Sequence, residues 1–227
     1  MARITNIGIC NSRHKTEALF VLANMYSAEY NKGNGKGEKN MKAWKHFKTI
    51  TKHKMLVMEG CFKVGLYKQG LMHDLSKYSP VEFRTGARYY QGNKSPNAAE
   101  RAEKGYSEAW MHHKGRNRHH YEYWTDMCRA TGRYESVPMP RKYLVEMVMD
   151  RRAACMVYEG EEYTSASPLN YLERSIEKAL MNPQTVKELS YILTMLRDEG
   201  EDVTFQYLRE DVLKGKPFPW EEPEEKK

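Results

Sequence analysis

The stretch Leu71-Met72-His73-Asp74-Leu75-Ser76-Lys77-Tyr78-Ser79-Pro80 places a histidine and an aspartate side by side after an apolar run. The flanking residues are typical of the end of a buried helix, where His and Asp are uncommon unless a partner satisfies them. A divalent metal ion would satisfy both His73 and Asp74. This pair therefore decides both the expected fold and the expected chemistry.

A helix start follows the His-Asp pair directly. Ser79 suits the N-cap position, Pro80 suits the first helical position, and Glu82 is placed to complete a capping box. Residues 74–78 are therefore expected at a junction between two helices, where polar side chains can face a shared cavity. Lys77 lies in this junction, and its ammonium group is a candidate to contact a substrate phosphate. The alternative for Lys77 is a surface lysine whose stem packs on apolar residues.

Helical patterns dominate the rest of the chain, and we find no strand alternation in the sequence. A helix is predicted for residues 13–30, and a glycine-rich flexible loop for residues 31–37. The next predicted helix covers residues 41–59, with one face marked by Trp44, Phe47, Thr51 and Met55. Further helices are expected over residues 61–73, from 80, over 97–114, from 119, over 141–158, after Ser167-Pro168, after Asn182-Pro183, and over 203–213. The predicted fold class is all-α.

Three segments are expected along the 227 residues. They are an N-terminal helical appendage with its loop (1–40), a helical domain (41–213) and a loosely ordered acidic tail (214–227). The absence of a long apolar run excludes a membrane span, and the start of the sequence lacks the layout of a signal peptide. The four cysteines form no CxxC pair, which favours reduced thiols. We therefore expect a cytoplasmic protein without a membrane partner.

The formal net charge of +7 is unevenly distributed. Residues 1–60 hold 11 Lys and Arg against 4 Asp and Glu, and residues 61–150 hold 15 against 10. Residues 151–227 hold 11 against 16. The basic part coincides with the histidine-rich part. A basic field around a site favours anionic substrates such as phosphate esters, or nucleic acid.

Most of the histidines are concentrated in one part of the chain. Six of the eight fall between positions 53 and 120: His53, His73, His112, His113, His119 and His120. Two carboxylates, Asp74 and Asp150, lie in comparable apolar contexts. Imidazole and carboxylate together suit Mn, Fe, Co, Ni or Zn better than Mg, and a carboxylate can bridge two ions about 3.5–4 Å apart. The expected cofactor is one or two divalent transition metals.

The first ion is expected to bind four side chains: His53, His73, Asp74 and Asp150. They come from three helices, and this ligand count leaves positions open for water and substrate. Two alternatives remain. His46 competes with His53 on the same helix, where packing is its other role. Asp150 can instead pair with Arg151 or Arg152.

The second ion is assigned to two His-His pairs that flank a Gly-Arg-Asn-Arg turn. Helical phase favours His113 and His120 as ligands. The alternates are His112 and His119. Arg116 and Arg118 in the turn are candidates to clamp a substrate phosphate. The alternative for the whole segment is a basic surface that binds phosphate without metal.

The order of these residues resembles the HD superfamily of metal-dependent phosphohydrolases. The string His-Asp-Leu-Ser-Lys is similar to the His-Asp-Ile-Gly-Lys variant of phosphodiesterase-type members, with Ser76 in place of glycine. Residues 45–195 resemble more closely a bacterial and phage family. It is marked by a His-Asp-Leu-Ser-Lys…Ser-Pro segment, a Trp-x-His-His-x-x-Arg-Asn-x-His-His segment and a Met-Pro…Asp segment.

The resemblance implies an HD-domain-like helical bundle with one or two divalent metals. It implies hydrolysis of a nucleotide or another small phosphate ester by metal-activated water, with Asp74 and Lys77 as catalytic residues. Two alternatives follow from the same residues. One is a non-catalytic module that binds nucleic acid or senses a ligand, and the other is a di-iron oxygenase on the same scaffold. The substrate and the oligomeric state stay open.

Overall fold

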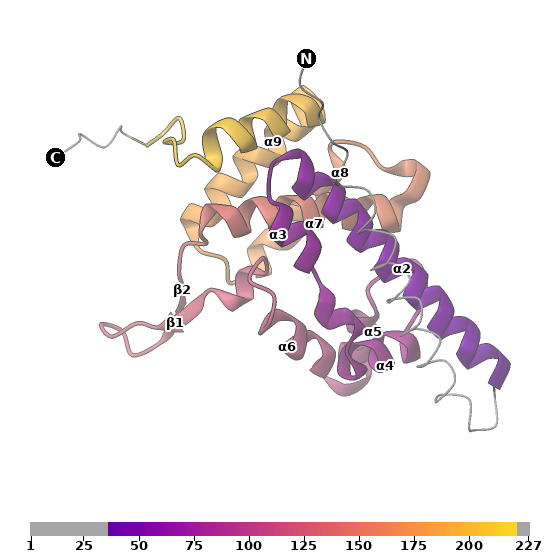
Figure 1. The fold of residues 1–227 in the computed structure, drawn as a ribbon. Helices are drawn as coiled ribbons and strands as arrows, with labels where there is room; N and C mark the ends of the chain where they lie inside the picture. Colours follow the sequence, from indigo (N-terminus) through magenta and orange to yellow (C-terminus); the bar gives the residue numbers. More distant parts are fainter. Residues whose placement is uncertain (1–35, 222–227) are drawn as a thin grey trace, which may run out of the picture.

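The computed structural model describes residues 36–221, which form an all-α helical bundle with one small β-hairpin (Figure 1). The predicted helix over residues 13–30 and the last residues of the predicted tail, 222–227, lie outside the described residues. Within the described part, none of the helices combines the length and the apolar character that a membrane-spanning helix requires.

The helix α2 (Lys36–Lys63) begins where the sequence predicted the end of a flexible loop. The predicted start of this helix at residue 41 is therefore five residues too late. The apolar residues that α2 buries are spaced three, seven and four apart along one face: Phe47, Ile50, Val57 and Cys61. Trp44 and Met55, which marked the predicted face, are 41% and 48% exposed. The predicted face is therefore wrong at these two residues, although Phe47 is buried as predicted, and the buried side of α2 also includes His46 and His53.

The junction after α2 turns the chain towards the interior. Gly65 adopts a φ of 86°, and the amide of Leu66 donates to the carbonyl of Cys61 over 2.8 Å. This left-handed turn ends α2, so the predicted single helix over residues 61–73 is wrong. The chain then forms α3 (Tyr67–Met72), a 3₁₀ turn (Leu75–Tyr78) and α4 (Pro80–Arg88). Ser79 and Pro80 start α4 as predicted.

The predicted helix over residues 97–114 is divided in two by Gly105, which has a φ of 82°. The two helices are α5 (Pro96–Lys104) and α6 (Glu108–Lys114). Ser107 caps α6, since its hydroxyl accepts from the amide of Trp110. The helix expected from His119 is wrong. In its place are a 3₁₀ turn (Tyr121–Tyr123) and a hairpin of β1 (Thr125–Met127) and β2 (Tyr134–Ser136).

The helix α7 (Arg141–Glu159) matches the helix predicted over residues 141–158, and it lies at the centre of the bundle, where it packs against α2, α8 and α9 (Figure 1). The helices α8 (Ser167–Ser175) and α9 (Pro183–Tyr207) begin at the predicted Ser-Pro and Asn-Pro pairs. The core forms where these helices meet, and its fully buried members include Leu144, Val148, Leu172, Leu189 and Leu193. This packing fixes α7 rigidly against α2.

The expected loose order of the tail does not hold for residues 214–221. A π-helical turn (Leu208–Val212) follows α9, and Phe218 is only 1% exposed. Phe218 stacks on Trp220, with ring centroids 5.0 Å apart. Arg141 at the start of α7 pairs with Glu221 over 2.9 Å. The prolines and acidic residues of this segment suggested disorder, but burial of its two aromatic rings holds it on the core.

The helix α9 bends at Gly200, where φ is 80° and ψ is −177°. Only glycine adopts this conformation without strain of about 1–3 kcal/mol. We therefore predict that Gly200→Ala lowers the free energy of unfolding by about 1–3 kcal/mol, measured by urea denaturation. Gly37→Ala is the control, because Gly37 is helical and has no described atom within 4 Å of an added Cβ. Equal stability of the two variants would contradict the assignment of strain to Gly200.

Candidate metal centre

Asp74 is the residue on which the site converges, and its backbone is strained. With φ at 52° and ψ at 25°, it is the only non-glycine residue with a positive φ in the described part of the chain. This conformation costs an ordinary residue about 1–2 kcal/mol. It directs the carboxylate into the interior, where Asp74 is 1% exposed. Strain of this kind is concentrated at functional sites in proteins.

Lys54 on α2 binds the backbone of the turn that leads into Asp74. Its ammonium group donates to the carbonyl oxygens of Leu71 and His73, both at 2.8 Å. The side chain is buried, and burial lowers its pKa from the ordinary value, while Asp74 opposes this shift. Lys54 therefore satisfies two backbone carbonyls at the end of α3 and fixes the path of the chain into Asp74.

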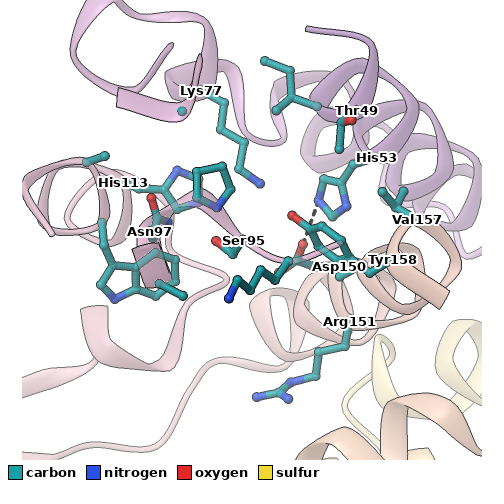
Figure 2. Close-up of a pocket in the computed structure, with 18 of the residues that line it drawn as sticks. Thr49, His53, Lys77, Ser95, Asn97, His113, Asp150, Arg151, Val157 and Tyr158 are labelled. Atoms are coloured by element: carbon teal, nitrogen blue, oxygen red, sulfur yellow. Dashed lines mark ion pairs between the residues drawn. The ribbon is translucent and has the colours of Figure 1, made fainter. Parts of the chain in front are cut away.

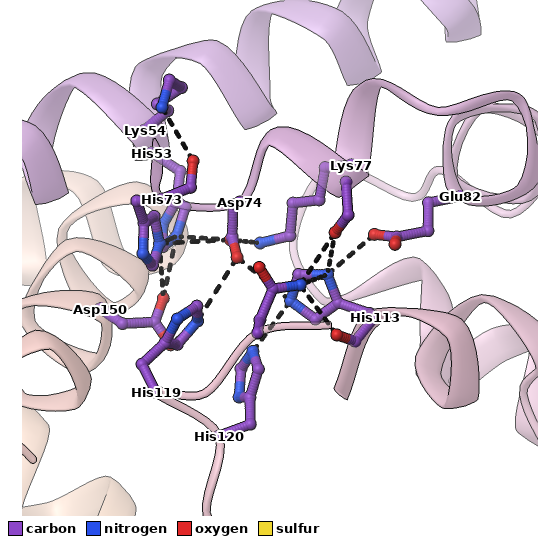
Figure 3. Close-up of polar contacts among 12 residues, drawn as sticks. His53, Lys54, His73, Asp74, Lys77, Glu82, His113, His119, His120 and Asp150 are labelled. Atoms are coloured by element: carbon purple, nitrogen blue, oxygen red, sulfur yellow. Dashed lines mark hydrogen bonds and ion pairs between the residues drawn. The ribbon is translucent and has the colours of Figure 1, made fainter. Parts of the chain in front are cut away.

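Four side chains from different elements form the first group of donor atoms: His53, His73, Asp74 and Asp150. One donor atom of each lies within 4.8 Å of the others (Figure 3). His53 Nε2 is 2.9 Å from Asp150 Oδ1, and His73 Nε2 is 3.3 Å from Asp74 Oδ2. Because α2 carries His53 and α7 carries Asp150, the packing of these two helices assembles the group.

A second group has the same span and shares Asp74 with the first: Asp74, His113, His119 and His120. Asp74 Oδ1 lies 3.2 Å from His113 Nε2 and 3.4 Å from His119 Nε2. His120 Nε2 lies 2.8 Å from His113 Nε2. The two carboxylate oxygens of Asp74 thus face different histidine groups, as expected of a bridging ligand.

The residues present fit a bound cation. Both oxygens of Asp74 and the Nε2 atom of His119 are buried without a hydrogen-bond partner among the described residues. Unpaired buried polar atoms are costly unless something else satisfies them. Burial raises the pKa of Asp74, but His73 and Lys77 outweigh burial and hold it well below its usual range. The carboxylate is therefore ionised and available to a metal.

Two carboxylates outside these groups orient the histidine rings. Glu146 Oε1 lies 3.0 Å from Nδ1 of His73 and 3.1 Å from Nδ1 of His119. Glu82 Oε2 lies 2.8 Å from Nδ1 of His113. An ionised carboxylate only accepts hydrogen bonds, so Nδ1 carries the hydrogen and Nε2 of the neutral ring keeps its lone pair. Without a metal, Asp74 and the neighbouring carboxylates outweigh burial and raise the pKa of His73 and His113 above its usual value, so an ion that binds these rings would displace the proton from Nε2.

The structure differs from the sequence expectations at several of these residues. Glu82 does not close a capping box, because it accepts from the histidines of α6. Both His119 and His120 join the centre, whereas helical phase selected only His120. That argument fails because α6 ends at Lys114 and residues 119–120 follow a turn. Glu146 was missed, and its signal was its position one helical turn before Asp150.

Two other histidines lie outside the groups. His112 Nδ1 lies 2.6 Å from Glu82 Oε1, and His112 belongs to neither donor group. His46 packs on Phe83, with ring centroids 5.4 Å apart, and burial lowers its pKa to about 4. Of the competing candidates on α2, the structure therefore places His53 in the centre and His46 in the packing around it.

A cavity of about 570 Å³ adjoins the centre (Figure 2). Its wall includes His53, Lys77, His113, His120 and Asp150. The predicted phosphate clamp stays a prediction, and neither arginine of the Gly-Arg-Asn-Arg turn lines this cavity. Arg116 donates to the carbonyl of His112, and Arg118 donates to the hydroxyl of Tyr143. The arginine that does line the cavity is Arg151.

Residues 42–195 match the model of a family described as a family of unknown function (DUF5662). The match covers more than half of the chain, so the chain belongs to this family. No curated protein and no solved structure matches the chain. The matched segment contains every residue of the two donor groups. Function is therefore argued from the geometry of the site.

Asp74→Asn removes the charge that the two groups share, with little change in shape. We predict that the purified variant binds divalent metal about 100-fold more weakly than the wild type, measured by metal titration and by elemental analysis. Asp202→Asn on an exposed part of α9 is the control and keeps wild-type metal content. Equal metal content in both variants, with circular dichroism showing intact helices, would refute the bridging role of Asp74.

Glu146→Gln tests the orientation of the rings separately from ligation. Glutamine can present its NH₂ group to Nδ1, which disturbs the tautomer of His73 and His119. We predict a loss of about 10- to 100-fold in metal affinity, with the same number of ions bound at saturation. Glu161→Gln, at an exposed position after α7, is the matched control. Unchanged affinity in Glu146→Gln would show that this carboxylate does not orient the rings.

Proposed function

We propose that this chain is a metal-dependent phosphohydrolase of the HD superfamily, which acts on a nucleotide or another small phosphate ester in the cytoplasm. One observation carries the proposal. The buried Asp74 carboxylate divides its two oxygens between two histidine groups, beside a cavity large enough for a small substrate. Such a donor set suits Mn, Fe, Co, Ni or Zn. The positive net charge of the chain also favours an anionic substrate.

The two donor groups would hold one or two divalent ions, with Asp74 between them. When bound, such ions polarise a phosphoryl oxygen and lower the pKa of water. Glu146 and Glu82 keep the histidine rings in the orientation that this binding requires. The remaining wall of the cavity must position the ester, since phosphoryl transfer depends mainly on positioning and charge stabilisation.

Lys77 supplies a fixed positive charge at the edge of the cavity. Its Nζ atom is 2.5 Å from Asp74 Oδ2, and its side chain is 29% exposed. Burial lowers the pKa of Lys77, but Asp74 and Asp150 outweigh burial and raise it above its usual range. The group therefore stays an ammonium ion at neutral pH. From this place it can stabilise negative charge on a phosphoryl or leaving-group oxygen.

His120 also lines the cavity and is the neutral counterpart of Lys77. Burial holds the pKa of His120 well below its usual range, and the neighbouring His119 and His113 lower it further. Its ring is therefore uncharged at neutral pH and keeps one nitrogen lone pair. Because His120 lines the cavity, this nitrogen can bind an ion or accept a proton from a group in the cavity.

The proposal is tested with protein purified without a histidine tag. Its metal content is measured first, and phosphate release is then assayed on nucleotides and simple phosphate esters with Mn, Fe, Co, Ni, Zn or Mg. We expect turnover with at least one transition metal and none with Asp74→Asn. Bound metal without phosphate release from any ester would contradict the proposal, as would full activity in Asp74→Asn.

Lys77→Met removes the ammonium group and keeps much of the side-chain volume. We predict a fall in kcat of about 100-fold, the size of effect that removal of one electrostatic donor produces, with the metal content unchanged. Lys68→Met, at an exposed position of α3, is the control. A wild-type kcat in Lys77→Met would remove Lys77 from the mechanism and leave the metal centre untouched.

The same donor set is compatible with the second candidate function, a di-iron oxygenase, because histidines and a shared carboxylate also bind two irons. An activity that requires iron, consumes oxygen and releases no phosphate would identify it. The third candidate, a nucleic-acid-binding module, rests on the basic first 60 residues, most of which lie outside the described residues. A salt-sensitive gel shift without turnover would favour it.

A further inference from the structure

The cavity extends beyond the metal centre to a cationic side chain that the proposed chemistry does not use. Arg151 follows Asp150 on α7 and lines the same cavity. Figure 2 shows its side chain extending from α7 away from Lys77. A group bound at the metal centre and a group bound at Arg151 would therefore occupy different parts of one cavity.

The guanidinium group of Arg151 lacks the partners that such a group normally has. Its Nε and Nη1 atoms are buried and have no hydrogen-bond partner among the described residues. The group lies over the ring of Tyr171, 5.6 Å from the centroid, which limits its orientation. A partly buried guanidinium without a carboxylate or phosphate partner is unusual, because its planar donors suit bidentate binding of these anions.

Other polar and charged groups around the cavity affect whether it favours an anionic ligand. Lys94 lines it from the loop before α5, and Figure 2 shows Ser95 and Asn97 at the start of α5 in the same wall. A helix N-terminus favours negative charge. Glu122 opposes the binding of an anion, because its side chain also lines the cavity. Its Oε2 atom is buried without a partner among the described residues. Burial raises the pKa of Glu122, which reduces this opposition.

We propose that Arg151 anchors a second anion subsite, so that the substrate is a phosphate ester carrying a further phosphate or carboxylate group. The proposal rests on the proposed function, because the first phosphate is assigned to the metal centre. The distal anion binds the guanidinium group, and Tyr171 supports that group from behind. Arg151 is thus a specificity-determining residue, while hydrolysis itself depends on the centre around Asp74.

The test uses phosphonates, whose carbon–phosphorus bond is not a substrate for ester hydrolysis, so that binding is measured without turnover. Titration calorimetry on the metal-loaded protein compares alkyl phosphonates with ω-carboxyalkyl phosphonates and with α,ω-alkane bisphosphonates of two to six methylene groups. We expect the second anion to tighten binding at least tenfold at one spacer length. The last two series show whether a carboxylate or a phosphate-sized anion fits better.

The variants are judged by the ratio of affinities for the two-anion and one-anion probes. Arg151→Gln lowers this ratio to about one, and Arg151→Lys restores part of it, because lysine keeps the charge but not the bidentate geometry. Glu122→Gln raises the ratio severalfold by removing an opposing charge. Arg197→Gln on the exposed face of α9 leaves it unchanged and serves as the control. Opposite effects at Arg151 and Glu122 exclude general misfolding as the cause.

Three results would overturn the proposal. They are a ratio near one in the wild type at every spacer length, a ratio in Arg151→Gln equal to that of the wild type, and a lower ratio in Glu122→Gln. These failures are distinct from failure of the proposed function. Phosphate release from simple esters without a preference for two-anion probes would remove only the subsite. Preference without phosphate release from any ester would remove the hydrolase and keep the subsite.

Discussion

The structure depends on one buried carboxylate that needs positive charge on both sides. Asp74 Oδ1 faces two histidines of one group, Oδ2 faces two histidines of the other, and no hydrogen bond within the described chain satisfies either oxygen. The ammonium group of Lys77, 2.5 Å from Oδ2, supplies part of the positive charge, and an ionised carboxylate buried without such partners would cost several kcal/mol. The residues around Asp74 are arranged so that this free-energy cost is reduced. The strained backbone at Asp74, the Lys54 clamp and the pairing with Lys77 all hold the carboxylate in place.

The packing of α2 against α7 keeps the residues around Asp74 in place. Each helix brings a member of the first donor group, His53 from α2 and Asp150 from α7, and each also brings a supporting group. Lys54 is next to His53 in sequence, and Glu146 lies one turn before Asp150. A shift of one helix along the other would therefore disturb ligands and supports together. The fully buried residues of the core, such as Val57 and Val148, make such a shift costly.

Sequence analysis predicted the parts that depend on local patterns. His73 and Asp74, the start of α4 at Ser79-Pro80, the extent of α7 and the all-α class all follow from short-range signals. Contacts between residues far apart in the sequence could not be predicted from such local patterns. Glu82 looked like a capping residue and became a partner of histidines, and the strands of the hairpin are too short to show alternation. His119 was ranked below His120 because helical phase was applied to residues that form a turn.

In the proposed function, the histidines and carboxylates of the centre would bind a phosphoryl group through the metal and would not by themselves select one ester from another. Selection among substrates has to come from the rest of the cavity. The helix α7 sets the distance between the centre and the residue proposed to make this selection. Within six residues this helix carries the ring-orienting Glu146, the ligand Asp150 and the unpaired Arg151. Because residues 144–149 of α7 are buried, the helix fixes the backbone positions of Asp150 and Arg151, and the contact with the ring of Tyr171 limits where the guanidinium group lies. A rigid separation of this kind favours ligands of one length over shorter and longer ones, and so discriminates among anions that the metal centre alone would treat alike.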